Sequence, residues 1–155
     1  MRLHGLAVCA FGLAAVAASP ALGEEWRKVS VDREGAAVMG VEVSRLRGPQ
    51  NARYARIVTV LKQAQTFSGV AVDYMVSEER VDCTTRIMKT DVIIMYAGTR
   101  QIISNTTGPI TKAEPKTVGW AVFETVCQAK WLPDAPAASL EAFFRTQRAA
   151  LLAGE

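Results

Sequence analysis

The strongest constraint on the fold is a change in hydrophobic period near residue 106. Before that point, short stretches rich in β-branched residues alternate between apolar and polar positions, with turn residues between them. An alternation of period two is typical of strands with one buried face. Ala37, Met39, Val41 and Val43, for example, fall on one face. The expected strands are 26–32, 36–44, 53–62, 70–77, 81–87, 92–96 and 100–105.

Short connections separate these stretches, which favours antiparallel neighbours. Residues 33–35 form the turn of an expected hairpin between the first two stretches. Residues 78–80, "EER", are assigned to another hairpin turn because charged residues are common there. Cys83 then shares a packed strand face with Val81 and Thr85.

Beyond an irregular loop at 106–116, apolar residues recur every three to four positions. Trp120, Phe123 and Val126 form this stripe, which continues to Trp131 and predicts an amphipathic helix. A helix laid across one face of an antiparallel sheet satisfies both hydrophobic periods.

A second, weaker helical stripe runs from Ser139 to Ala153 after a linker that contains two prolines. Ser139 suits the N-cap position. The adjacent Phe143 and Phe144 favour docking of this helix on the domain, whereas the linker and the terminal position favour mobility. Both arrangements remain open.

The first 23 residues predict the compartment. Arg2 precedes an apolar run from Leu6 to Ala18, and small residues follow. This three-part pattern is typical of a secretory signal peptide, with a retained N-terminal anchor as the alternative. We expect cleavage between Gly23 and Glu24, which leaves no transmembrane segment in the mature chain.

Cleavage would also change the chemistry of the chain, because it removes the only histidine, His4. Without histidine, Ser-His-Asp and Cys-His catalysis and all histidine-containing metal sites are excluded. Loss of Arg2 from 18 basic residues leaves 17 against 15 acidic ones, a net charge of +2. This balance gives no argument for nucleic-acid binding. We expect no enzyme, no metal and no cofactor.

The mature chain keeps two cysteines, Cys83 and Cys127. An even pair in an exported protein indicates a disulfide, with two free thiols as the alternative. Neither cysteine belongs to a Cys-x-x-Cys pair. The sequence therefore predicts an α+β fold, in which an antiparallel sheet of about five to six strands carries a packed helix, a second terminal helix and one disulfide. The domain is expected at 24–131, and the linker with the terminal helix at 132–155.

The densest basic cluster brackets one loop and comprises Arg45, Arg47, Arg53 and Arg56. Such a cluster can recognise a sulfated glycan, an anionic lipid headgroup or an acidic partner. An ordinary charged surface is the alternative.

Two other groups of residues have a structural interpretation. Asp73, Asp82 and the glutamates between them lack the spacing of a calcium loop, so we assign them to solvated surface. Trp26, Trp120 and Trp131 are assigned to the core, as most large aromatic residues are.

Several widely spaced residues form a recognisable pattern: Trp26, Asp32, Asp82, Cys83, Arg86, Trp120, Val126 and Cys127. This pattern resembles the surface-adhesin protein E-like family of exported bacterial proteins, over about residues 26–127. The resemblance implies an antiparallel sheet with a packed helix and a disulfide between the two cysteines. Through the family's name, it also implies an adhesive role.

We therefore expect an exported binding protein, periplasmic or surface-associated, whose partner is a protein or an envelope component. One alternative is a structural or accessory subunit of an envelope complex, with the terminal helix as its docking element. Another is a glycan hydrolase that uses carboxylates alone and would need two opposed carboxylates roughly 5 to 10 Å apart.

Overall fold

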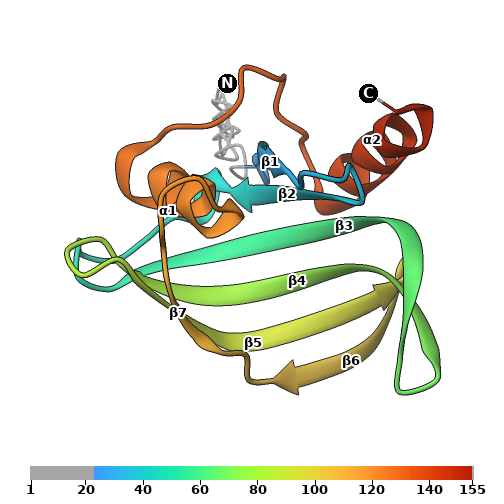
Figure 1. Cartoon of the computed structure of the whole chain (residues 1–155), viewed down its shortest axis with the longest axis horizontal. Helices are drawn as coiled ribbons and strands as arrows, with labels where there is room; N and C mark the ends of the chain where they lie inside the picture. Colours follow the sequence, from blue (N-terminus) through green and yellow to red (C-terminus); the bar gives the residue numbers. More distant parts are fainter. Residues whose placement is uncertain (1–22, 155) are drawn as a thin grey trace, which may run out of the picture.

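The computed structural model describes residues 23–154, so the expected signal segment, apart from Gly23, lies outside the described residues. The described chain forms one seven-stranded antiparallel sheet and two α-helices (Figure 1). The strands are β1 (Trp26–Val31), β2 (Ala37–Glu42), β3 (Arg53–Phe67), β4 (Val70–Asp82), β5 (Ile87–Ala97), β6 (Arg100–Thr106) and β7 (Ile110–Lys112). The helices are α1 (Val118–Gln128) and α2 (Leu140–Ala153), and a 3-10 turn, η1 (Val43–Arg45), follows β2.

Strand order follows chain order from β1 to β6, and β7 pairs with the first part of β5. Each strand on this path is hydrogen-bonded to the next one in the sequence, so no crossover connection is needed. The predicted antiparallel α+β architecture is confirmed, and the short β7 is an addition to the expected strands.

Two long strands, β3 and β4, form the centre of the sheet. They meet at a two-residue turn in which Ser68 and Gly69 have φ angles of 49° and 80°. Positive φ at both central residues is typical of the hairpin turns that match strand twist. The turn therefore lets β3 continue to Phe67, well beyond its expected end at residue 62.

The hairpin turn expected at residues 78–80 is wrong. These residues lie inside β4, where a β-bulge between Glu78 and Glu79 shifts the register against β5. The extra residue of this bulge is Asp91 of β5, because Glu78 lies opposite Val92 and Glu79 opposite Thr90, so β4 itself continues without an inserted residue.

The turn lies instead at residues 83–86, so Cys83 is a turn residue and not a strand residue. Asp82 shapes this turn, because its Oδ1 accepts hydrogen bonds from the backbone N–H groups of Thr84 (2.8 Å) and Thr85 (3.1 Å). These bonds, with that of Thr85 first, hold the pKa of the Asp82 carboxyl below its usual range. Asp is suited to turns for this reason.

Helix α1 is shorter than its apolar stripe. Thr117 caps its first turn by accepting a hydrogen bond from the Trp120 N–H (3.1 Å), and Ala129 ends it in the left-handed conformation with φ of 55°. The predicted continuation to Trp131 is therefore wrong. Trp131 lies on the following segment, 38 % exposed, with the Arg27 guanidinium 5.2 Å from its ring centre.

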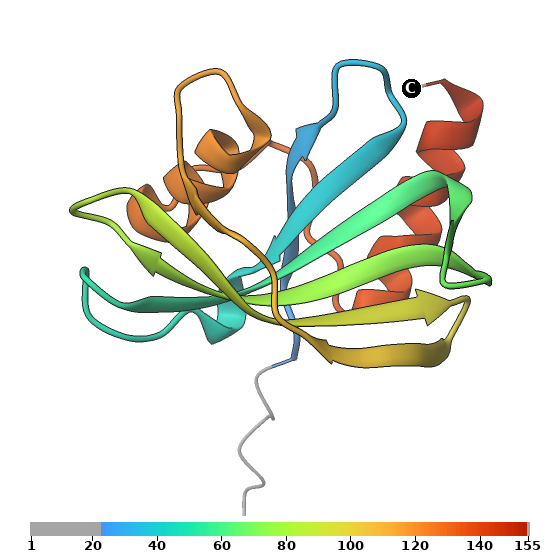
Figure 2. The same cartoon turned by 60° about the horizontal axis from the view of Figure 1, so that its bottom comes forward.

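The two helices pack on opposite faces of the sheet and towards opposite ends of β3 (Figure 1). Side chains alternate along β3, so Ile57 belongs to the core beneath α1 while Val58 belongs to the core beneath α2. Figure 2 shows the same separation from a second direction. Because each helix covers only part of its face, the rest of the sheet stays uncovered.

The C-terminal segment is docked. Its linker runs along β1, where Trp26 and Ala137 exchange two backbone hydrogen bonds of 2.9 and 3.0 Å. Phe143 of α2 is 1 % exposed and lies directly over Gly40, where a side chain would overlap the ring. The linker thus closes the β1 edge, and α2 covers one end of the second face.

Candidate functional site

The residues that carry the family-like pattern build the frame of the domain. Cys83 and Cys127 form a disulfide with a Cα–Cα distance of 5.7 Å, joining the β4–β5 turn to α1. Beside it, the Arg86 guanidinium lies 6.0 Å from the centre of the Trp120 ring. The predicted disulfide is therefore confirmed, and it contributes structure rather than a reactive thiol.

The remaining residues of the pattern act at the N-terminal end of the sheet. Asp32 shapes the β1–β2 turn by accepting a hydrogen bond from the Ala36 N–H (2.6 Å). Trp26 is fully buried and packs against Phe143, with its indole N–H donating to Glu24 Oε2 (3.0 Å). These residues therefore have structural roles, and the candidate functional surface lies elsewhere on the domain.

The predicted arginine cluster is divided by the sheet. Arg56 and Tyr54 point to the face that α2 partly covers, whereas Arg53 points to the α1 face, where its Nη1 donates to the Val126 carbonyl (3.2 Å). Neighbouring strand residues alternate between faces, so proximity in sequence did not bring all four side chains together. Arg53 is thus not part of one basic patch, but Arg45, Arg47 and Arg56 line one pocket.

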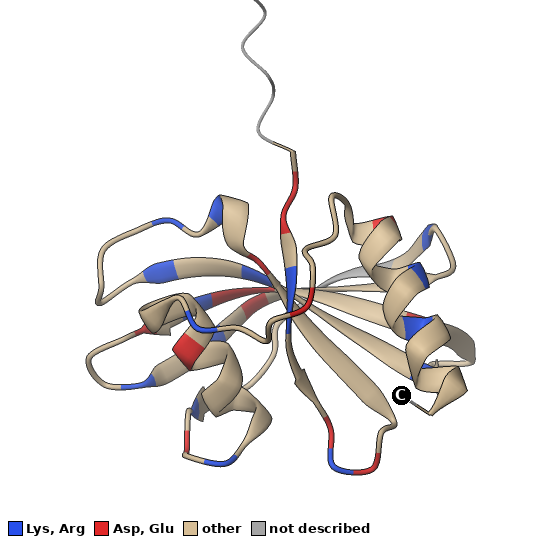
Figure 3. Cartoon of the chain, turned by 90° about the horizontal axis from the view of Figure 1, so that it is seen from above, with Lys and Arg blue, Asp and Glu red and all other residues tan. Residues whose placement is uncertain are grey.

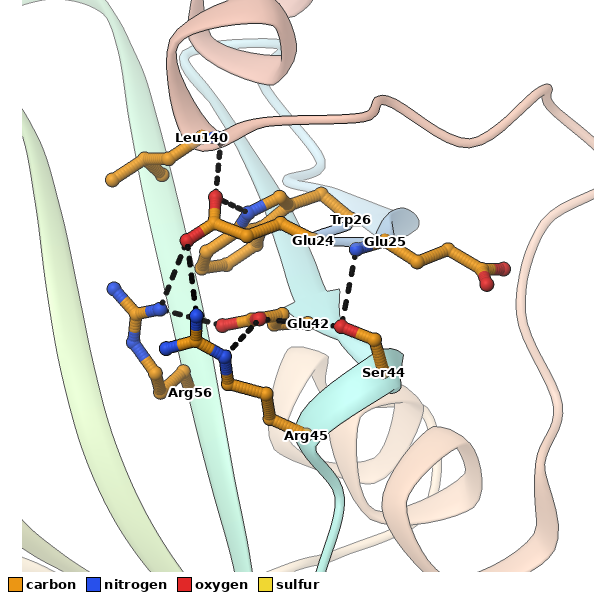
Figure 4. Close-up of polar contacts among 8 residues, drawn as sticks. All are labelled: Glu24, Glu25, Trp26, Glu42, Ser44, Arg45, Arg56 and Leu140. Atoms are coloured by element: carbon orange, nitrogen blue, oxygen red, sulfur yellow. Dashed lines mark hydrogen bonds and ion pairs between the residues drawn. The ribbon is translucent and has the colours of Figure 1, made fainter. Parts of the chain in front are cut away.

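A buried carboxylate holds two of these arginines. Glu42, fully buried at the end of β2, accepts hydrogen bonds from Arg56 Nη1 (2.6 Å) and Ser44 Oγ (3.2 Å), and Arg45 Nε lies 3.0 Å from it (Figure 4). A buried charge needs such partners, since it has lost its hydration. Glu42 was not predicted from the sequence as a site residue. A charged residue ending an otherwise apolar strand was the available signal.

Glu24 extends this network to the C-terminal helix. Its Oε1 lies 3.4 Å from Arg56 and 3.9 Å from Arg45, and its Oε2 accepts the backbone N–H of Leu140 at the start of α2 (3.0 Å; Figure 4). Burial disfavours the charged form, but the hydrogen bonds from Trp26 and Leu140 and the charge of Arg56 lower the pKa of Glu24. The network therefore joins the segment before β1, the sheet and α2.

The pocket next to this network has a volume of about 260 Å³. Charges of both signs surround it, and Figure 3 shows both along the strands away from α2. Arginine donors come from the segment around η1 and from β3, and carboxylate acceptors from β4 and β5. The lining residues are Arg45, Arg47, Tyr54, Ala55, Arg56, Glu78, Glu79 and Asp91.

A line of side chains crosses the strands beside this pocket, on the face opposite α1. Register places Arg47 beside Tyr54, Tyr54 beside Arg80, Arg80 beside Lys89, and Lys89 beside Ile110. Partners directly opposite in antiparallel strands project to the same face. We call Arg47, Tyr54, Arg80, Lys89 and Ile110 the cross-strand row.

The centre of the cross-strand row is Tyr54, which is 40 % exposed. The guanidinium carbons of Arg47 and Arg80 each lie 5.7 Å from its ring centre, within the range of cation–π attraction. Asp91 pairs with Arg80 (2.8 Å) and Lys89 (3.5 Å), and the hydrogen bond from Arg80 is the main reason that the pKa of Asp91 is lowered.

Glu79 borders the pocket, but its side chain points to the α1 face of the sheet, because it lies opposite Ala55 in the register; burial raises its pKa. Its Oε1 accepts hydrogen bonds from Ser77 Oγ (3.0 Å) and Thr90 Oγ1 (3.5 Å), which only partly offset the loss of water. No cation pairs with it among the described residues.

The described residues were also compared with the requirements of a membrane-spanning helix and of a metal site. Within residues 23–154, neither helix has the length and apolar character needed to cross a bilayer. The same part of the chain contains no cluster of side chains suited to hold a metal ion.

Comparison with known proteins gives one match. A sequence model of the family described as Surface-adhesin protein E matches residues 26–128. Curated proteins and solved structures give no match. The matched region begins at Trp26, contains the whole sheet and ends with α1, whereas α2 follows it. The chain belongs to the surface-adhesin protein E family.

Proposed function

We propose that the chain is an exported, non-catalytic binding protein of the bacterial envelope that recognises a protein or an envelope component in an adhesin-like manner. Family membership and the expected signal peptide support this role. The observation that carries the proposal is the uncovered end of the sheet, where Tyr54 is exposed among charged groups beside a pocket. An exposed aromatic residue flanked by arginines is typical of recognition surfaces.

The state of the pocket carboxylates supports binding over hydrolysis. Asp91 forms ion pairs with Arg80 and Lys89, and the Glu79 side chain points to the opposite face of the sheet. A carboxylate-only hydrolase needs two carboxylates free to act on a bond between them. We therefore favour a site that holds its ligand without changing it.

The docking of α2 argues against its use as the element that joins an envelope complex. Phe143 and Leu151 are buried against the chain's own sheet, so the apolar face of the helix is occupied. Of its large apolar side chains, Leu152 is exposed at 63 %. Binding through the sheet remains the better-supported alternative.

The test is retention on a defined panel of immobilised extracellular-matrix proteins and purified envelope fractions. Residues 24–155 are compared with a Tyr54→Ala, Lys89→Gln double variant of the cross-strand row. The control is Arg145→Gln, which removes one charge from a side chain that is 74 % exposed on α2. We expect the double variant to lose retention and the control to keep it. Equal retention of all three would refute a role of this face, and turnover of a glycan substrate would refute a non-catalytic protein.

A further inference from the structure

We propose that the cross-strand row and its pocket bind an acidic glycan chain, with one sugar ring in the pocket and the anionic groups of the chain along the row. This inference rests on the proposed binding function and names its ligand class. It follows from four properties of the site: the spacing of its side chains, the availability of its cations, the exposed ring of Tyr54, and the carboxylate acceptors among the basic donors.

The spacing of the row suits a linear ligand that crosses the strands. Neighbouring strands lie about 4.7–4.9 Å apart, so the row presents one side chain per strand at this interval. Three of its five members are cations, Arg47, Arg80 and Lys89. A polymer with repeated anionic groups can contact them in turn, whereas a single small anion engages one or two.

The cations are available to a ligand. Among the described residues Arg47 makes no ion pair, and the side chains of Arg80 and Lys89 are 43 % and 44 % exposed. Asp91 is shared by Arg80 and Lys89, so two positive charges face one negative charge. The row keeps a positive excess, and arginine binds sulfate or carboxylate through paired N–H groups.

Tyr54 supplies an apolar surface at the middle of the row. Tyr54 is 40 % exposed, and the guanidiniums of Arg47 and Arg80 each lie 5.7 Å from the centre of its ring. A tyrosine offers one flat apolar ring and one hydroxyl, which suits a ligand with both C–H and O–H groups. The pocket volume of about 260 Å³ is at the small end for ligand sites, consistent with one ring and not several.

The carboxylate acceptors beside the basic side chains favour a glycan over a polyanion that has no hydroxyl groups. Glu78 lies opposite Arg56 in the register and forms no ion pair among the described residues. Glu78 and Asp91 would repel phosphate groups packed closely, but they can accept hydrogen bonds from hydroxyls. A chain that carries hydroxyl groups between its anionic groups satisfies both kinds of side chain.

The test measures binding of residues 24–155 to four probes of matched length: a sulfated heparin oligosaccharide, a hyaluronan oligosaccharide with carboxylates only, a neutral malto-oligosaccharide and poly-glutamate. We expect binding to one or both acidic glycans, weakened by added salt because the charges are exposed. The two acidic glycans distinguish sulfate from carboxylate as the recognised group. Preferred binding of poly-glutamate would overturn the glycan assignment in favour of an acidic peptide.

Variants connect binding to the row. Arg47→Gln with Lys89→Gln is expected to weaken glycan binding roughly tenfold or more, the usual effect of losing charge-assisted hydrogen bonds. Tyr54→Ala should weaken it further than Tyr54→Phe, and Arg145→Gln should leave it unchanged. Equal weakening by Arg145→Gln would show non-specific attraction and overturn the proposal.

The outcome also separates this inference from the proposed function. If no glycan binds while row variants still lose retention on the protein and envelope panel, the ligand class is wrong and the binding function stands. If neither glycan binding nor retention depends on the row, both proposals fail.

Discussion

Glu42 is the residue on which the geometry of the pocket most depends. It is fully buried, yet it holds Arg56 and Arg45, two of the three arginines that line the pocket. Burial strengthens these ion pairs because little water screens them. The carboxylate therefore positions the guanidiniums that a ligand would meet.

We predict that Glu42→Gln lowers the free energy of unfolding by about 2–3 kcal/mol, since it removes one side of a buried charge network. Arg56 and Arg45 keep some access to water, which limits the loss. Urea unfolding followed by tryptophan fluorescence measures it. Glu25→Gln is the matched control, because Glu25 is 41 % exposed and should change stability by about 0.5 kcal/mol or less. An equal effect of both variants would contradict the role of Glu42.

Glu79 gives a prediction about pH. Burial raises its pKa in the folded state, so the protonated form is favoured by folding. Its contribution to stability is therefore present below the ordinary glutamate pKa of 4.5 and is lost as pH rises through the folded-state pKa. Glu79→Gln should unfold at higher urea than the parent chain near pH 7, with a difference that shrinks towards pH 4. A difference independent of pH would exclude this explanation.

At the residue scale, the sequence predicted the disulfide, but it did not predict which face of the sheet each arginine occupies. Two cysteines in an expected exported chain allow one pairing, and Cys83–Cys127 is present. Arg53 and Arg56 are close in sequence, but strand alternation sends them to opposite faces. Glu42 could not be predicted as a buried charge, because its partners come from η1, from β3 and from the residues before β1.

At the scale of elements, hydrophobic period predicted both helices and most of the strands, but not β7 or the end of β4, and local turn chemistry decided where the elements end. β4 continues through Glu78 and Glu79, which pair with Arg56 and Ala55 of β3, and the register shift against β5 is taken up by Asp91 of β5. The stripe of α1 continues in sequence to Trp131, but Ala129 in the left-handed conformation ends the helix first. A bulge and a helix stop are each set by the backbone conformation of one or two residues, so neither is visible in a periodic pattern.

The docking of α2 depends on one glycine. A methyl group at position 40 would overlap the ring of Phe143, and both groups are held in the core between sheet and helix. We predict that Gly40→Ala destabilises the chain by about 1–3 kcal/mol through overpacking. Thermal unfolding monitored by circular dichroism measures the effect.

Gly119→Ala is the control for this substitution. Gly119 lies in the first turn of α1, where a methyl group would make only ordinary contacts, the nearest at 3.7 Å. Alanine is preferred over glycine in helices, so stability should rise by about 0.5–1 kcal/mol. If Gly40→Ala is as well tolerated as Gly119→Ala, the close approach of α2 to β2 is wrong.

The disulfide joins two elements that are 44 positions apart. Because it restricts the unfolded chain, its replacement in Cys83→Ser with Cys127→Ser should cost about 4 kcal/mol. Denaturant unfolding of the double variant measures this loss, and mass spectrometry of the parent chain should show two hydrogens fewer than the reduced form. Two alkylatable thiols in the native parent chain would contradict the disulfide.

At the scale of the whole molecule, the parts have separate tasks. The disulfide and α1 stabilise one face of the sheet, and the linker and α2 close the β1 edge and one end of the other face. What stays uncovered is the end of the sheet that carries the cross-strand row. The sequence predicted the sheet, the helices and the disulfide but not this uncovered surface. The surface is the part of the sheet that neither helix covers, and its position depends on how the helices pack.

The most direct test of the central claim, that this uncovered face is the binding surface, is nuclear magnetic resonance mapping with the sulfated oligosaccharide. Amide signals of ¹⁵N-labelled residues 24–155 are followed during titration. We expect the shifts to concentrate around the cross-strand row, at Arg47, Tyr54, Arg80 and Lys89, while the signals of α2 stay unchanged. Shifts concentrated on α2 or along the β1 edge, or no shifts at saturating oligosaccharide, would contradict it.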